Sequence, residues 1–120
     1  MSRRDDRAYL WDMVENAELV LRNVAGKSFE EFSSEGILRD AVLYRLAVIG
    51  EASPKVSEAI RKTVPELPWP QMKGMRNVLI HDYFAIRIDR AWDTIVTHLP
   101  VLVETLRRHF PDLKSPAEGT

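Results

Sequence analysis

Arg76 and His81, an arginine and a histidine five residues apart, are the residues of this chain best suited to chemistry. Arginine is permanently ionised and can grip a phosphate through two N–H groups, so it can stabilise a phosphorane-like transition state. Histidine exchanges protons near neutral pH, so it can take the proton of a 2′-hydroxyl or protonate a leaving 5′-oxygen. These are the residue types needed to cleave RNA without a metal ion.

The spacing of this pair suggests that two copies of the segment cooperate. Residues five apart on an ideal helix point about 140° away from each other, so Arg76 and His81 do not converge from one straight helix. Either the helix distorts near His81, or a second copy faces the first across a two-fold axis. Asn77 could orient the His81 ring from four residues away, and Tyr83 lies close to the stripe of Arg76. Two nearby cations could add contacts to an RNA backbone: Lys73 and Arg87.

The same spacing also has a plain structural interpretation. In it, Arg76 is a surface cation, His81 a helix-end residue and Tyr83 a packed ring. A metal centre is not a good alternative, since His98 and His109 are about 16 Å apart along a helix, too far to share one ion. We therefore expect no metal, and the spacing alone leaves catalysis and structure both open.

The composition is that of one small globular domain. The chain has 120 residues, no cysteine and a formal net charge of −1. Without cysteine there can be neither disulfides nor zinc–thiolate sites, which suits the cytoplasm. No signal peptide or membrane span is expected, because the charged N-terminus leads into an amphipathic stretch. The low net charge excludes a protein-wide basic field, so any nucleic acid must bind a local patch or a dimer groove.

Apolar residues recur at helical spacing through most of the chain. We expect a first helix over residues 5–25 ending before Gly26, and a polar connection over 28–34 with Phe29 and Phe32 folded back. A second helix, capped by Ser33 or Ser34, should extend to about residue 63 as the apolar centre of the fold.

The second half of the chain predicts two more helices. Pro70 suits the first turn of a third helix over residues 71–83, which carries the Arg76–His81 pair. Asp89 should cap a fourth helix reaching His109, which Pro100 should kink or split. The expected fold is an all-α, antiparallel bundle of four to five helices. We expect residues 1–110 to form the domain and 111–120 a flexible C-terminal tail.

Residues 76–83 (RNVLIHDY) resemble the Arg-X4-His-X-Tyr signature of the HEPN superfamily, specifically of its HepT-like toxins. The resemblance extends to residues 45–52 (RLAVIGEA), to Trp69, and to residues 89–92 and 98–100 in the last helix. Together these segments span roughly residues 5 to 110.

The resemblance implies a dimeric HEPN bundle in which two motifs line a shared cleft. It implies a metal-independent endoribonuclease toxin, with tRNA as one candidate substrate, that uses Arg76 and His81 for catalysis and Asn77 and Asp82 in support. It also implies a toxin–antitoxin pair of the type VII kind, in which a minimal nucleotidyltransferase silences the toxin by transferring AMP to Tyr83. An AMP group there would place an anion beside the catalytic arginine and block the cleft. No cofactor is implied.

Two non-catalytic hypotheses remain open from the sequence. In one, the chain is a helical adaptor that binds a nucleotidyltransferase or a nucleotide, and Arg76 holds phosphate without cutting. In the other, the chain is a structural dimerisation bundle whose motif residues form a polar interface.

Overall fold

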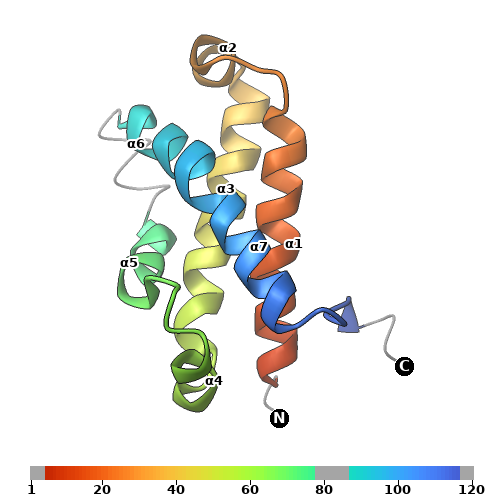
Figure 1. The fold of residues 1–120 in the computed structure, drawn as a ribbon. Coiled ribbons are helices and arrows are strands. Elements are labelled where there is room, and N and C mark those ends of the chain that lie inside the picture. The colour runs from red at the N-terminus through yellow and green to blue at the C-terminus, as the bar shows by residue number, and fades with distance from the viewer. Residues whose placement is uncertain (1–4, 78–86, 117–120) are drawn as a thin grey trace.

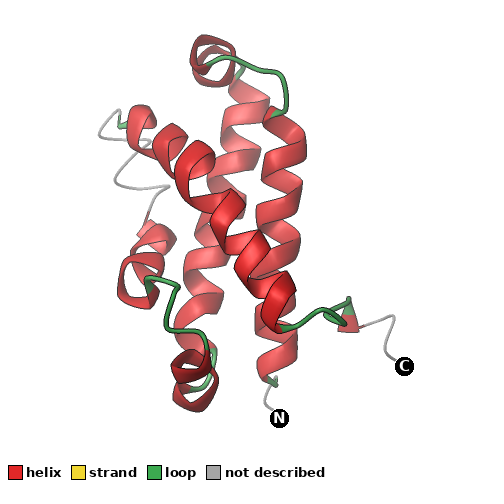
Figure 2. Ribbon diagram, viewed as in Figure 1, coloured by secondary structure: helices red, strands yellow, loops and turns green. Residues whose placement is uncertain are grey.

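The computed structural model describes residues 5–77 and 87–116, and these residues form helices without any β-strand (Figures 1 and 2). Two long helices, α1 (Asp6–Val24) and α3 (Gly36–Ala52), lie side by side and run in opposite directions, and α7 (Leu99–His109) packs across α1 (Figure 1). The predicted all-α bundle is therefore confirmed. No helix in these ranges is long and apolar enough to cross a membrane.

α1 begins and ends where the sequence predicts. The Asp5 side chain accepts a hydrogen bond from the Ala8 N–H at 3.0 Å, which satisfies one free donor of the first turn. Gly26 follows the helix with a φ of 76°, a left-handed conformation that favours glycine. The predicted stripe lies in the core, where Leu10, Val14 and Ala17 are buried.

The segment after α1 corrects our expectation of a polar connection, because it contains the short helix α2 (Phe29–Ser34). Ser28 and Glu31 form a capping box, in which each side chain accepts a hydrogen bond from the other's backbone N–H. Phe32 is fully buried and stacks on Trp92 with ring centroids 5.2 Å apart. This side chain therefore folds back onto the bundle, as we expected.

The second predicted helix is wrong at both ends. α3 begins at Gly36 after Glu35, with no side-chain cap, so neither Ser33 nor Ser34 caps it. It ends at Ala52, and the 3₁₀ turn η1 (Ser53–Lys55) and the separate helix α4 (Glu58–Thr63) follow. Pro54 explains the break, since it has no N–H to donate to the Gly50 carbonyl. As predicted, α3 is central and contacts several elements: α1, α2, η1, α5 and η2.

The third predicted helix starts two residues earlier than expected and changes from an α-helix to a 3₁₀ turn after Lys73. α5 (Trp69–Lys73) has Pro70 in its first turn, in agreement with the prediction, and passes into the 3₁₀ turn η2 (Gly74–Asn77). The rest of the predicted helix lies outside the described residues.

The last predicted helix is divided into three parts. α6 (Ile88–Asp93) has Arg87 at its N-cap, so our assignment of Asp89 as the cap is wrong; Asp89 lies in the first turn and pairs with Arg87 instead. A π-helical segment, η4 (Thr94–His98), then leads into α7, with Pro100 in the first turn of that helix. A π turn before Pro100 accommodates a residue that lacks an N–H, so the helical rod continues past Pro100 with a changed hydrogen-bond pattern, where we had expected a kink or a split.

Part of the chain beyond α7 packs back onto the bundle. Leu113 is buried, and its carbonyl accepts a hydrogen bond from Arg107 Nη1 at 2.7 Å. Arg107 also pairs with Glu18 of α1 at 2.8 Å and lies over the ring of Trp11.

Candidate active site

Arg76 and Asn77 lie on η2, the 3₁₀ turn at the end of α5, and both are exposed. Lys73 is exposed three residues earlier, at the last position of α5. Among the described residues, no acidic side chain forms an ion pair with Arg76 or Lys73. Two cations are therefore presented to solvent on consecutive turns, where they can receive an anion.

A close backbone contact fixes the position of Arg76. Gly50 of α3 is buried directly against η2, and a Cβ built at position 50 would lie 2.0 Å from the Arg76 nitrogen and 2.5 Å from the Met75 carbonyl carbon. Only glycine allows two backbones to approach so closely. Met72 is buried and Met75 packs against the core, so both sides of the turn are anchored while Arg76 faces outward.

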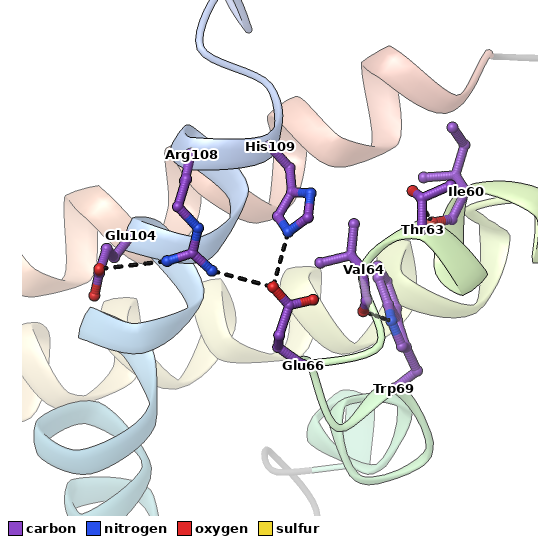
Figure 3. Close-up of polar contacts among 8 residues, drawn as sticks. All are labelled: Ile60, Thr63, Val64, Glu66, Trp69, Glu104, Arg108 and His109. Carbon is purple, nitrogen blue, oxygen red and sulfur yellow. Dashed lines mark hydrogen bonds and ion pairs between the residues drawn. The ribbon is translucent and has the colours of Figure 1, made fainter.

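The loop that leads into α5 is tied down by polar contacts (Figure 3). The Trp69 indole N–H donates to the Val64 carbonyl at 2.9 Å, which closes the loop on itself. Glu66 reaches α7, where its Oε2 atom lies 2.9 Å from His109 Nε2 and 3.1 Å from Arg108 Nη2. The hydrogen bond with His109, more than that with Arg108, lowers the pKa of Glu66 from 4.5 to about 2. These contacts join the loop before the motif to the last helix.

The described residues include only part of the predicted site. Arg76, Asn77 and Lys73 come together on α5 and η2, whereas His81, Asp82 and Tyr83 lie outside the described residues. The predicted orientation of the His81 ring by Asn77 thus stays a prediction. Arg87, proposed as a phosphate contact, is half exposed and lies 3.4 Å from Asp89. An RNA phosphate would have to displace the Asp89 carboxylate to bind the Arg87 side chain.

His98 and His109 lie at the ends of helical segments. His109 is the last residue of α7 and binds Glu66, while His98 is exposed at the end of η4. Within residues 5–77 and 87–116, no group of three or more histidine or carboxylate side chains is placed to hold a metal ion.

Comparison with known proteins identifies the family. A family model described as ribonuclease HepT-like matches residues 13–114. The chain belongs to the HepT-like family. Relatives include a "Putative RNase" of Methanocaldococcus jannaschii, 37% identical over 83% of this chain and 92% of its own. A "Probable ribonuclease HepT" of Thermococcus cleftensis is 34% identical over 83% of this chain and 91% of its own. No solved structure is significantly similar to the chain.

Two features of this HepT-like site were missed in the sequence. Gly50 lies in the segment that resembles the family, but nothing in a single sequence tells which backbone will touch a helical glycine.

Arg45, on the same helix, donates from Nη1 to Asn16 Oδ1 at 3.2 Å, and Asn16 in turn donates to the Asp12 carbonyl at 2.8 Å. Arg45 is the one charged residue between Ala41 and Gly50, and a charge in such an apolar stretch was a signal of a polar partner on a neighbouring helix. The hydrogen bond between Arg45 and Asn16 links α3, which supports the motif, to α1.

Proposed function

We propose that this protein is a metal-independent endoribonuclease toxin that cleaves RNA with Arg76 and His81. The observation that carries the proposal is the outward-facing Arg76, presented on a turn whose backbone is held against Gly50. A backbone held in this way gives the arginine side chain a fixed point of attachment beside a bound phosphate, and stabilisation of transition-state charge is the largest single contribution in many enzymes. Membership of the HepT-like family supports the same reading.

In the proposed reaction, the 2′-hydroxyl of one nucleotide attacks the adjacent phosphorus and the bond to the 5′-oxygen breaks. His81 handles the proton, either taking it from the 2′-oxygen or giving one to the leaving oxygen. Arg76 stabilises the extra negative charge on the phosphoryl oxygens, with Asn77 and Asp82 in support. The products are a 2′,3′-cyclic phosphate and a 5′-hydroxyl end, and no water is consumed in this step.

We further propose that the active form is a homodimer in which two motifs share one cleft. The support is the five-residue spacing, which on an ideal helix would point Arg76 and His81 away from each other, and the low net charge, which leaves RNA binding to a local groove. This arrangement is tested by mixing Arg76→Ala protein with His81→Ala protein. If each active pair takes its arginine from one subunit and its histidine from the other, a mixed dimer keeps one intact pair. Activity should then return on mixing. No recovery, in a preparation shown to exchange subunits, would contradict a pair shared between chains.

The proposed regulation is AMP transfer from ATP onto Tyr83 by a partner nucleotidyltransferase. An added phosphodiester near Arg76 would occupy the place of the substrate phosphate. Incubation with ATP and a nucleotidyltransferase encoded beside this gene should add AMP to the wild type and abolish cleavage, whereas Tyr83→Phe should stay unmodified and active. Modification at another residue would contradict this regulation.

The activity itself is tested with purified protein, cellular RNA or tRNA, and EDTA. The wild type should cleave and leave cyclic phosphate ends, while His81→Ala should lose cleavage and keep its helical circular dichroism spectrum. If His81→Ala cleaves like the wild type, or cleavage requires a divalent metal, the proposed mechanism fails. Binding of RNA without cleavage would instead favour the adaptor function.

A further inference from the structure

A pocket opens beside the turn that carries Arg76, between α5 and η2 on one side and η4 and α7 on the other. Its volume is about 270 Å³. Ligand pockets for drug-sized molecules are typically roughly 300–1,000 Å³, so this one suits a single small ring system. Its walls are mainly apolar, and four buried or half-buried side chains contribute to them: Met72, Met75, Leu99 and Leu102.

The methionines link the pocket to the candidate active site. Met72 precedes Lys73 and Met75 precedes Arg76, so each pocket methionine is followed by an exposed cation. Neither cation lines the pocket itself, so the two charges lie outside it, where they can meet a phosphate joined to a group held within. Methionine sulfur also packs favourably against aromatic rings, which makes these walls suitable for a flat heteroaromatic group.

The opposite wall comes from the π-helical segment. Thr94 and His98, the two ends of η4, both line the pocket, and the Leu99 N–H donates to the Thr94 carbonyl five residues back. Single π turns are uncommon and occur often at functional sites. The Thr94 hydroxyl donates to the Arg90 carbonyl at 3.1 Å, so its oxygen can still accept a hydrogen bond from a ligand. The pocket thus combines apolar walls with a few polar groups at its edge.

The charge around the pocket favours an anionic chain. Among the lining residues that the structure describes, the one carboxylate is that of Glu66, which is paired with Arg108 and His109, and this pairing offsets its repulsion of phosphates. Lys73 and Arg76 pair with no described carboxylate. A ligand with an aromatic ring joined to phosphate matches this arrangement better than an apolar peptide does, since a peptide would leave both cations unused.

We infer that this pocket binds one nucleobase of a single-stranded RNA substrate while Arg76 holds a neighbouring phosphate. The inference depends on the proposed ribonuclease function and adds a base-binding subsite to it. A base held there would select which phosphodiester lies against the catalytic residues. Double-stranded RNA would be a poor substrate, because its bases are paired and stacked and cannot enter a pocket.

Two half-exposed valines provide a matched pair of variants. Val101 lines the pocket and is 52% exposed, whereas Val96 is 50% exposed on the same helical rod and does not line it. Val101→Trp should fill the pocket, and Val96→Trp should add the same side chain elsewhere. Both proteins should fold, since neither position is in the core.

Cleavage rates are compared on a short single-stranded RNA and on versions lacking one base beside the cleaved bond. In the wild type, removing one particular base should lower kcat/KM by roughly 5- to 150-fold, the range for loss of one stacked base. Val101→Trp should lose a similar factor on intact RNA and lose no more when that base is removed. Val96→Trp should behave as the wild type. Equal behaviour of the two tryptophan variants would overturn the inference and leave the ribonuclease function standing.

A second readout does not require cleavage. Methionine methyl signals of Met72 and Met75 should shift in NMR spectra when nucleoside monophosphates are added to the wild type or to Val96→Trp, and should stay unchanged in Val101→Trp. Such shifts in a protein that cleaves no RNA would support the pocket while contradicting the ribonuclease function. If Val101→Trp abolishes binding of a protein partner and leaves nucleotide binding and cleavage unchanged, the pocket is a protein-docking site and the inference is wrong.

Discussion

Replacing Gly50 with alanine tests how strictly the bundle fixes the position of Arg76. The new Cβ would lie 2.0 Å from the Arg76 nitrogen and 2.8 Å from its Cα, where ordinary contacts begin at 3.4 Å. The turn must therefore move away from α3 by on the order of 1.5 Å to restore normal contact. A misplacement of about 1 Å at a catalytic group can reduce activity by about 100-fold.

Gly50→Ala should also destabilise the fold, because the atoms that meet the new Cβ belong to the backbone and cannot rotate away. Alanine gains about 1 kcal/mol over glycine inside a helix, whereas overpacking costs about 1–3 kcal/mol and more where the backbone must move. The free energy of unfolding, measured with urea, should accordingly fall by about 2 kcal/mol or more, while kcat/KM for RNA cleavage by the folded protein falls by about 100-fold.

Gly74→Ala is the matched control for this change. Gly74 lies on η2 two residues before Arg76, and a Cβ there would meet nothing within 4 Å. This variant should keep wild-type cleavage and gain about 0.4–1 kcal/mol of stability, because alanine restricts the unfolded chain. If Gly50→Ala and Gly74→Ala cleave RNA equally well, the close contact does not position Arg76 and the reasoning is refuted.

Three further predictions concern the frame that holds the site. The pKa of Glu66 is lowered to about 2, chiefly by His109, so this group stabilises the fold above its unfolded pKa near 4.5 and loses that effect as the pH falls from 4.5 towards 2. Urea titrations at pH 6 and pH 3 should show that loss in the wild type and a smaller one in Glu66→Gln; equal losses would contradict it. Arg107→Ala removes the ion pair with Glu18 and the hydrogen bond to the Leu113 carbonyl, so it should lower the free energy of unfolding by about 1–2 kcal/mol. Arg22→Ala, which removes an exposed arginine, is the control and should lower it by less than about 0.5 kcal/mol. Equal losses would show that the Arg107 contacts do not stabilise the fold. Phe32→Ala should cost about 3–5 kcal/mol, because the ring is fully buried against Trp92, and a loss below 1 kcal/mol would mean that α2 is not part of the cooperative core.

The sequence predicts α1 well because its apolar periodicity and its end signals agree. Asp5 and Gly26 mark α1 at both ends, and Pro100 marks the division between η4 and α7. Errors occurred where a short signal was outweighed by a longer pattern. The apolar run of α3 hid the effect of Pro54, and the polar character of residues 28–34 hid the capping box that starts α2.

The residues of the candidate site stay a prediction. Residue types alone identified Arg76 as a group suited to phosphate chemistry, and its exposure is compatible with that role and with that of a surface cation. The contact with Gly50 and the pocket between η2 and η4 depend on how distant segments pack. Such contacts leave no periodic trace in a single sequence, so they became visible only in the folded chain.

The catalytic role of Arg76 is tested most directly by the cleavage of RNA in EDTA by Arg76→Ala and by Arg22→Ala. Both variants remove one exposed arginine, but Arg22 lies in the last turn of α1, whereas Arg76 lies on η2. We expect Arg76→Ala to lose about 100- to 1,000-fold in kcat, the scale for losing one group that stabilises transition-state charge, while Arg22→Ala stays within about twofold of the wild type. Equal rates for the two variants would contradict a catalytic role for Arg76.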